Sequence, residues 1–426
     1  MTTMTMMGVV TQARVHHLFI GNLYPPARLY ALAFDDEAPY RLEVTANMTA
    51  DSAHSWIAFD ANRTNVYGAS LNKSAIASYE VIVAVANASS ADGNGHATIE
   101  ETKNVTLELR NSVAAAGACF NRTSAYVLPH PQYPRVFSAS WPGPDACAMS
   151  LSTTPPPPAN GSSGGGGGGI LEEVVQSWRY GNTSGIHGLA LDPSDGGMTI
   201  YSADLNGDAL WAHFLSPDGT GRVVGLRGRY DLPDAQKGSH PRHLVVHPSG
   251  KVLYVVMEAT NVVVAYAIDQ RLRIVAEELS RHSLLPPGAD PAAYWSAEVM
   301  LSQPEGAYLW ATARAWTGRR KDPTQPPFAP HPGFISAFRL DGESGAITEQ
   351  LFRVPTTTLD GIANAISPAP WSEDWAAMTD VGTGYVQMWR MERTEGDGGV
   401  VATTARDVAR VNIPDGGCCA NVIWYD

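Results

Sequence analysis

Short hydrophobic runs separated by turn residues recur along the chain. Each run leads into a turn rich in Pro, Gly, Asp or Asn, continues as a strand centred on an aromatic residue, and is followed by polar residues and another strand. The clearest copies span residues 191–201, 247–254, 302–308 and 367–375. Runs rich in β-branched and aromatic residues that are bounded by turn residues are typical of β-strands.

The copies recur at the spacing of a propeller blade. Tyr201, Tyr254 and Tyr308 follow one another at intervals of 53 and 54 residues, and Trp375 comes 67 residues later, after the proline-rich segment Asp322–Pro332. A four-stranded unit that recurs every ~40–50 residues indicates a β-propeller.

Six copies, including weaker ones around Tyr67 and Tyr126, predict six blades. The runs at residues 17–20, 408–411 and 421–425 remain. Joining these N- and C-terminal strands in one further blade would close the ring and remove the exposed edges of an open sheet. We therefore predict an all-β, seven-bladed β-propeller over residues 15–426, preceded by a disordered tail over residues 1–14.

One segment has low complexity. Pro155–Pro158 and Gly164–Gly169 belong to a stretch that cannot bury a core. Because this stretch lies between two copies of the repeat, we predict a loop insertion over about residues 152–169 within the ring. The alternative is a linker between two separate β domains. The glycines also match G-x-G-x-x-G, but they follow no apolar strand and therefore do not indicate a nucleotide site.

Composition and charge exclude several classes of function. The 426 residues include 29 Lys and Arg against 42 Asp and Glu, a net charge of −13, which argues against a nucleic-acid partner. No apolar run approaches the ~18 residues of a membrane-spanning helix, and Met1–Val10 lacks the features of a signal peptide. We therefore predict a cytoplasmic protein with neither nucleic-acid nor membrane partners. The oligomeric state stays open, a homo-oligomer included.

Cysteines and glycosylation sequons give opposite indications about whether the chain is intracellular or secreted. Four cysteines are too few for a disulfide framework, and the adjacent pair Cys418–Cys419 is a poor candidate for a bridge. Eight N-x-S/T sequons matter only in a secreted chain, so we expect them to be unmodified. Their asparagines are Asn47, Asn62, Asn72, Asn87, Asn104, Asn121, Asn160 and Asn182.

Standard catalytic and metal-binding motifs are absent. The sequence contains no G-x-S-x-G, no P-loop and no H-E-x-x-H. His240, His243 and His247 lie close together, but on a strand His240 points away from the other two. We therefore predict core or turn histidines here, no metal site and no cofactor.

Polar residues that interrupt the repeated strands are better candidates for a site, because the innermost strands of a propeller line a central channel. Each lies among small or apolar residues, where an unpaired charge is costly. These candidates are His187, Arg242, Glu258 and Arg314, with Lys73 as a weaker fifth. Two arginines, a lysine and a histidine suit a small molecule with several carboxylates, since guanidinium binds carboxylate through two parallel bonds. The alternative is that Arg and Glu only join neighbouring blades as salt bridges.

Several stretches are shared with one enzyme family. They run from Val15 to Asp426 and are densest at Gly185-Ile-His-Gly, His240-Pro-Arg and Leu253-Tyr-Val-Val-Met-Glu-Ala. On these residues the chain resembles the fungal carboxy-cis,cis-muconate cyclases, within the lactonase or 6-phosphogluconolactonase-like family of seven-bladed propellers. The active-site residues proposed for that family match His187, Arg242, Glu258 and Arg314.

The resemblance implies a cofactor-independent cycloisomerase of the protocatechuate branch of the β-ketoadipate pathway. Its reaction converts 3-carboxy-cis,cis-muconate, a tricarboxylate, to 3-carboxymuconolactone. Arg242 and Arg314 would hold the carboxylates and stabilise the charge that develops on them, helped by Lys73. His187 would protonate carbon, with Glu258 orienting or charging it. Residues 84–169 match poorly, and Ile362 stands where the family has histidine, so the exact substrate stays open.

Two other functions are compatible with the same ring. One is a lactone hydrolase of the 6-phosphogluconolactonase-like type. Some propeller lactonases hold calcium, for which Asp204, Asn261, Asn364 and Asp380 are scattered candidates. The other is a non-enzymatic binding module, which is disfavoured because the Trp-Asp dipeptide of the WD repeats is absent.

Overall fold

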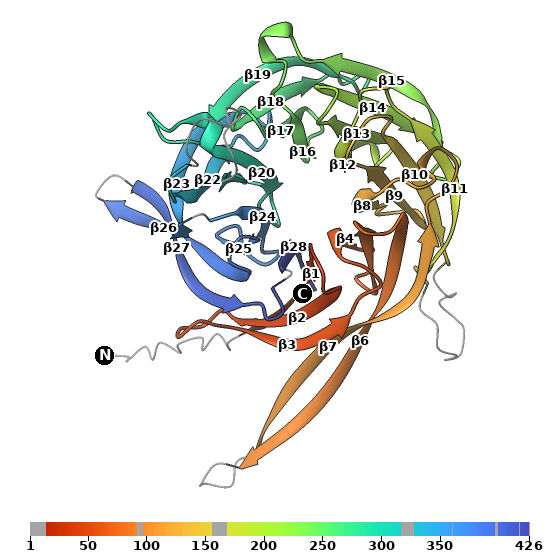
Figure 1. Ribbon diagram of the computed structural model, residues 1–426. Helices are drawn as coiled ribbons and strands as arrows, with labels where there is room; N and C mark the ends of the chain where they lie inside the picture. Colours follow the sequence, from red (N-terminus) through yellow and green to blue (C-terminus); the bar gives the residue numbers. More distant parts are fainter. Residues whose placement is uncertain are drawn as a thin grey trace, which may run out of the picture.

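Four-stranded antiparallel sheets surround a central axis in the computed structural model, like the blades of a propeller (Figure 1). The structure describes residues 14–91, 97–155, 168–316, 328–359, 361–396, 399–416 and 418–425. Within these residues there are seven sheets, which confirms the predicted all-β, seven-bladed architecture.

The strands follow one another blade by blade along the chain. The closing blade contains β28 (Cys418–Trp424), β1 (Val15–Asn22), β2 (Arg28–Asp35) and β3 (Arg41–Thr49). The next blade contains β4 (His54–Phe59), β5 (Asn65–Ser70), β6 (Ala75–Ala91) and β7 (Ala97–Ala114). It is followed by β8 (Ser124–Pro129), β9 (Arg135–Ser140), β10 (Cys147–Thr153) and β11 (Leu171–Arg179).

Four further blades complete the ring. They are formed by β12 (Ile186–Leu191), β13 (Thr199–Asp204), β14 (Ala209–Leu215) and β15 (Val223–Asp231), then β16 (Pro241–Val246), β17 (Val252–Met257), β18 (Val262–Ile268) and β19 (Val275–Ser283). The last two contain β20 (Tyr294–Leu301), β21 (Tyr308–Ala315), β22 (Pro332–Leu340) and β23 (Ile347–Leu359), then β24 (Ala363–Pro368), β25 (Trp375–Asp380), β26 (Tyr385–Gly396) and β27 (Gly399–Asn412). Short 3₁₀ turns lie at η1 (Gly117–Cys119), η2 (Pro193–Asp195), η3 (Asp234–Gln236) and η4 (Pro291–Ala293).

The ring closes through the N- and C-terminal strands. β28 pairs with β1, with Leu18 opposite Trp424, as the sequence predicts. The run at residues 408–411 was assigned to the wrong blade, because it lies in β27 and pairs with β26, where Val411 is opposite Val386. The closing blade therefore takes three strands from the N-terminus and only one from the C-terminus.

Most of the aromatic residues that mark the repeat lie in the second strand of a blade. Tyr201 and Tyr254 are fully buried in β13 and β17, between neighbouring blades. Tyr126 is an exception, because it lies in the first strand, β8, of its blade. Phe137 in β9 is the fully buried aromatic of that second strand. The aromatic residue of the repeat therefore marks the second strand in most blades and the first strand in the blade that contains Tyr126.

The Pro/Gly segment lies within one blade. β10 and β11 flank it and pair directly, with Thr153 opposite Leu171. The segment therefore connects two neighbouring strands, and the alternative of a linker between two separate domains is wrong. Residues 156–167 of the predicted insertion, and residues 1–13 of the predicted tail, lie outside the described residues.

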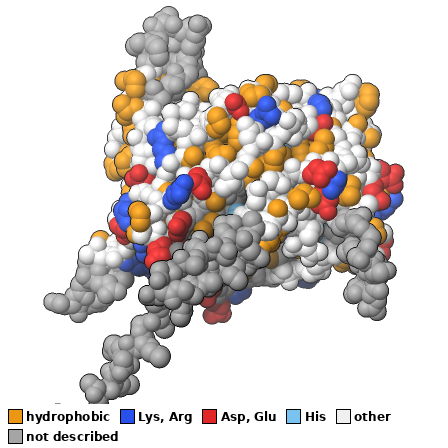
Figure 2. Space-filling model, turned by 90° about the horizontal axis from the view of Figure 1, so that it is seen from below, with side chains coloured by type: hydrophobic (Ala, Val, Ile, Leu, Met, Phe, Trp, Pro, Cys, Tyr) orange, Lys and Arg blue, Asp and Glu red, His pale blue; other side chains and the backbone are white. Residues whose placement is uncertain are grey.

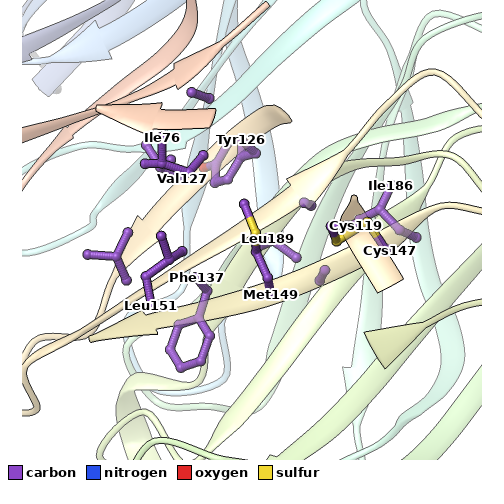
Figure 3. Close-up of a cluster of buried hydrophobic side chains, with 14 of the residues drawn as sticks. Ile76, Cys119, Tyr126, Val127, Phe137, Cys147, Met149, Leu151, Ile186 and Leu189 are labelled. Atoms are coloured by element: carbon purple, nitrogen blue, oxygen red, sulfur yellow. A yellow bond between two sulfur atoms is a disulfide. The ribbon is translucent and has the colours of Figure 1, made fainter. Parts of the chain in front are cut away.

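Hydrophobic clusters between the blades form the core. One of them joins three consecutive blades through Ile76 of β6, Val127 of β8 and Leu189 of β12 (Figure 3). At the edge of this cluster a disulfide links Cys119 to Cys147, with 5.5 Å between their Cα atoms. The sequence predicted no disulfide framework and did not identify this bridge, because the fold brings together two cysteines that are 28 residues apart.

The surface carries charges of both signs. Lys and Arg side chains lie beside Asp and Glu side chains on the face shown in Figure 2, and ion pairs such as Arg41–Glu43 and Arg229–Asp231 connect residues within outer strands. The hairpin β6–β7 projects from the ring (Figure 1). No helix in the described part of the chain is long and apolar enough to cross a membrane.

Candidate active site

A β-bulge near the start of each inner strand places side chains at the centre of the ring. In β12 the pairing with β13 shifts between Ile186 and Gly188, so that His187 is the extra residue. In β16 the shift between Pro241 and His243 leaves Arg242 in the same position. Because a bulge re-aims the side chain of its extra residue, His187 and Arg242 line one cavity.

This cavity has a volume of about 390 Å³. Four of the five predicted residues line it, and they come from three consecutive blades. They are His187, Arg242, Glu258 and Arg314. Four side chains that are spread over 128 positions of the sequence therefore meet around one cavity, which is large enough for a small organic molecule.

Glu258 connects the two arginines. Its Oε2 atom lies 2.9 Å from Nε of Arg242 and accepts a hydrogen bond of 2.8 Å from Nη2 of Arg314. Arg242 also donates to the carbonyl of Ala297, and Arg314 to the carbonyl of Trp295. The alternative, a salt bridge between neighbouring blades, is therefore met by Glu258 and Arg314, and the same ion pair forms part of the cavity wall. Two guanidinium groups share one carboxylate, so this group of three carries a net positive charge.

His187 contacts a second histidine rather than Glu258. Its Nδ1 atom lies 3.0 Å from Nε2 of His243, whose Nδ1 atom lies 2.7 Å from Oε2 of Glu298. Glu298 and His243 are both buried, and Oε1 of Glu298 accepts a hydrogen bond from the N–H of Val299. His187 is therefore oriented by His243, and not by Glu258 as expected from the sequence. His187, His243 and Glu298 come from β12, β16 and β20.

Burial controls the protonation states of His187, His243 and Glu298. It raises the pKa of Glu298 to about 8, although Arg242, the N–H of Val299 and Arg314 oppose the rise. Burial also holds the pKa values of His187 and His243 well below their ordinary range, and the neighbouring arginines lower them further. At neutral pH both imidazoles are neutral, and Glu298 is mostly protonated.

Aromatic side chains enclose the polar groups. Trp141 lies 5.3 Å from the ring of His187, and Trp56 lies 4.9 Å from the ring of His243. Trp295 and Trp316 stack on each other at 4.0 Å and also line the cavity, beside Arg314. These apolar walls limit the access of water and strengthen the electrostatic interactions inside.

Lys73 is not part of the cavity wall. Its side chain is exposed, and its Nζ atom pairs with Asp51 at 2.7 Å. The prediction that Lys73 binds substrate is therefore not supported by its position, because the loop after β5 directs it toward this carboxylate.

The calcium candidates of the alternative reading do not converge. Asp204 and Asp380 each accept the backbone N–H of the residue three positions later, which is the bonding of a turn. Asn261 binds backbone carbonyls near η4, and Asn364 lines the cavity. Within the described residues, no group of three or more His, Cys, Asp or Glu side chains is placed to hold a metal ion.

Sequence reasoning missed His243 and Glu298. His243 was expected to be a core or turn residue, and Glu298 was not singled out. Both follow the bulge of their inner strand by one position: Arg242 precedes His243, and Ala297 precedes Glu298. Aligning the inner strands on His187 and Arg242 would have found them.

Comparison with known proteins identifies the family. The carboxy-cis,cis-muconate cyclase of Neurospora crassa is 31% identical over 422 residues, which cover 97% of this chain and 100% of that protein. This chain belongs to the carboxy-cis,cis-muconate cyclase family. The family described as lactonase, 7-bladed beta-propeller, matches residues 177–357, which contain the four cavity residues. Muconate cycloisomerase 1 of Cutaneotrichosporon cutaneum is 28% identical over 213 residues, covering 47% of this chain and 50% of that protein.

Solved structures share the fold of this cyclase-family chain. A protein of Bacteroides fragilis described as a 6-phosphogluconolactonase has a TM-score of 0.66 at 16% identity, covering 97% of this chain and 98% of its own. The periplasmic gluconolactonase of Pseudomonas aeruginosa also has a TM-score of 0.66 at 16% identity, covering 96% and 99%. At such low identity these similarities show the propeller and not its chemistry.

Proposed function

We propose that the protein is a cycloisomerase that closes 3-carboxy-cis,cis-muconate to 3-carboxymuconolactone. The observation that carries this proposal is the arrangement of Arg242 and Arg314 around Glu258, on the wall of a cavity that His187 also lines. The full-length similarity to the Neurospora crassa cyclase supports the same substrate.

The charge of the site suits a polycarboxylate. Two guanidinium groups face one ionised carboxylate, and Glu298 is mostly neutral because burial raises its pKa. The cavity therefore has an excess of positive charge, although the protein as a whole is acidic. Guanidinium groups in a cavity walled by tryptophans bind carboxylates more strongly than they would in water.

The reaction is intramolecular and starts from an anion. One carboxylate oxygen adds to the far carbon of a conjugated double bond and closes a five-membered lactone. The displaced π electrons move toward the carbon next to another carboxylate, where an enolate-like charge develops. Arg242 and Arg314 fold the diene into reacting geometry and stabilise this charge, an effect of about 10²–10³ in rate for each well-placed donor.

A proton must then reach the carbon next to that carboxylate. His187 is the acid in this proposal, because it lines the cavity and its Nδ1 atom is already bonded to His243, which leaves Nε2 for the substrate. A positioned acid contributes roughly 10²–10⁴ in rate. The chain itself supplies every group that these steps use.

Loss of diene absorbance in the ultraviolet tests the proposal. Wild-type protein is mixed with 3-carboxy-cis,cis-muconate, and the lactone is identified by mass and NMR. His187→Ala and Arg314→Ala are each expected to lose roughly 10²-fold or more in kcat/KM while keeping the circular dichroism of the folded protein. Near-normal rates in both variants would reject this site.

A lactone hydrolase is the second candidate, since the lactonase family matches residues 177–357. Incubation with a phosphogluconolactone separates the two functions, because a hydrolase releases acid and leaves the muconate absorbance unchanged.

We place the cyclisation in the cytoplasm, as the sequence predicts. The disulfide Cys119–Cys147 is a feature more common in oxidising compartments, so fractionation of cells with an antibody to the untagged protein is the direct test.

A further inference from the structure

A line of hydrogen bonds leads from the cavity into the buried side of the site. It starts at His187, passes through His243 and ends at Glu298, with separations of 3.0 and 2.7 Å between the bonded atoms. His187 is partly exposed to the cavity, whereas His243 and Glu298 are 4% and 2% exposed. The line therefore connects one surface that can touch a ligand with a carboxyl group that is shielded from water.

The protonation state of Glu298 decides whether His187 presents a hydrogen-bond donor or an acceptor to the cavity. When Glu298 is ionised, it accepts from Nδ1–H of His243. Nε2 of His243 then accepts from Nδ1–H of His187, and Nε2 of His187 carries only a lone pair. When Glu298 is protonated, every bond reverses. His187 then presents Nε2–H to the cavity and becomes a donor.

The surroundings of Glu298 have opposing effects: Arg242, Arg314 and the N–H of Val299 favour its ionised form, whereas burial favours the neutral form of the second arrangement and prevails. The N–H of Val299 donates to Oε1, so that Oε1 is an acceptor and the proton belongs on Oε2, which faces His243. Arg242 lies 3.5 Å from Nδ1 of His243 through its Nη1 atom, and this positive charge disfavours an imidazolium there. The carboxyl group is also fully buried, which favours its neutral form.

We propose that Glu298, His243 and His187 form a proton relay, in which Glu298 supplies the proton that His187 delivers to carbon. The relay rests on the proposed cyclisation. As the lactone C–O bond forms, the π pair of the diene takes the proton from Nε2 of His187. Nδ1 of His187 takes the proton of His243, and Nδ1 of His243 takes the proton of Glu298. Glu298 becomes a carboxylate. After turnover, Nε2 of His187 takes a proton from water in the emptied cavity, and the reverse transfers through His243 return a proton to Glu298.

The relay explains how a histidine that stays neutral acts as an acid. Neither imidazole becomes a cation at any stage, since each gains one proton as it gives up another. This agrees with the pKa values of His187 and His243, which lie well below the neutral range. His187 is the catalytic residue of the three, and His243 and Glu298 act through it.

Other charged groups face the relay and set its pH range. Arg242 and Arg314 lie close enough to lower the pKa of Glu298, Glu258 holds both of them, and Tyr126 lies against the ring of His243 at 5.5 Å. The relay can deliver a proton only while Glu298 is protonated. Activity is therefore expected to fall as the pH rises through about 8.

¹⁵N NMR of the imidazole rings tests the relay without turnover. In the resting protein, both rings are expected to carry hydrogen on Nε2 at pH 6.5 and on Nδ1 at pH 9.5, with the change near pH 8. In Glu298→Gln the amide oxygen takes the place of Oε1 and the amide NH₂ donates to His243. Both rings are then expected to keep Nε2–H across this range. Tautomers in the wild type that do not change with pH would overturn the relay.

Kinetics supply the second measurement. Glu298→Gln is expected to lower kcat by roughly 10²-fold, because its amide cannot release a proton, and to abolish the fall in kcat above pH 8. The matched control is Glu278→Gln, on the outer strand β19, where Glu278 pairs with Arg281. Wild-type kcat in Glu298→Gln, or a fall above pH 8 that persists, would also overturn the relay.

The two proposals fail in different ways. If the wild type does not turn over 3-carboxy-cis,cis-muconate but its imidazole tautomers change near pH 8, the cyclase function fails, and only the coupled protonation of Glu298, His243 and His187 stands. If turnover is normal and the tautomers are independent of pH, the relay fails and the cyclase function stands. Should Glu298→Gln fail to fold, the wild-type NMR titration alone decides.

Discussion

Glu258 accepts a hydrogen bond of 2.8 Å from Arg314, which comes from the next blade of the propeller. The same carboxylate oxygen contacts Arg242 of its own blade at 2.9 Å. An ion pair that looks structural therefore holds two potential substrate-binding groups at the cavity wall. Removing one partner of a buried ion pair leaves the other charges uncompensated, which is costly.

Glu258→Gln separates the two consequences of this arrangement. KM for the tricarboxylate is expected to fall by roughly tenfold, because one negative charge fewer faces the substrate. We expect kcat to fall by roughly tenfold as well, since a neutral amide oxygen holds the two guanidinium groups less firmly than the carboxylate oxygen does. Steady-state kinetics at several salt concentrations measure both, with Glu43→Gln on the exposed strand β3 as the control. An increase in KM would contradict the charge argument.

The disulfide provides a test of stability. It closes a loop of 28 residues beside the hydrophobic cluster that joins three blades. Replacing Cys119 and Cys147 together by serine is expected to lower the free energy of unfolding by about 2–4 kcal/mol. Denaturation in urea measures this loss. Thiol titration of the unfolded wild type, without reductant, is expected to find neither cysteine free, and a positive reaction at Cys119 would show that the bridge is not formed in solution.

The repeat in the sequence predicted six blades, and the terminal strands that remained predicted the seventh blade and the closure of the ring. Turn residues and buried aromatics such as Tyr201 recur in every blade because each blade packs on the next in the same way. The repeat did not determine where a blade begins. Residues 408–411 were given to the wrong blade, since hydrophobic runs of neighbouring strands look alike.

The four polar cavity residues were also recognised from sequence, because charges among small apolar residues need a partner or a ligand. What the sequence concealed was the bulge. It puts His243 and Glu298 one position after the residues that line the cavity, so that they approach each other only when blades pack. Lys73 was misjudged for a related reason, since nothing in its own segment indicates that Asp51 lies within reach.

Burial of Glu298 predicts a stability that falls as pH rises. Its pKa is about 8 in the folded protein, above the ordinary value of 4.5, so the folded state holds a proton that the unfolded state has lost between these values. The contribution of Glu298 is therefore complete below about pH 4.5 and declines as the pH rises to 8, by up to about 1.4 kcal/mol per pH unit.

Glu298→Gln removes this dependence. The unfolding free energy of the variant, compared with that of the wild type, is expected to rise steadily between pH 5 and pH 8. His187 and His243 have the opposite effect on stability, because they stay neutral in the folded protein and this lowers the unfolding free energy below about pH 6.5. Wild type and variant share this effect, so it cancels in the difference. Urea denaturation at pH 5, 6.5 and 8 measures it. A difference that stays constant would mean that Glu298 is ionised in the folded protein.

Gly188 determines how closely the two histidine strands approach. A Cβ atom at this position would lie 2.7 Å from the carbonyl oxygen of Arg242 and 3.0 Å from Cα of His243. These are backbone atoms, so Gly188→Ala must push β16 away from β12 and lengthen the bond between His187 and His243. We expect a loss of about 1–3 kcal/mol in stability and a loss of roughly 10²-fold in kcat. Gly225→Ala is the matched control, because a Cβ atom there has no neighbour within 4 Å. Equal kinetics in the two variants would show that the contact between β12 and β16 is not needed for proton transfer.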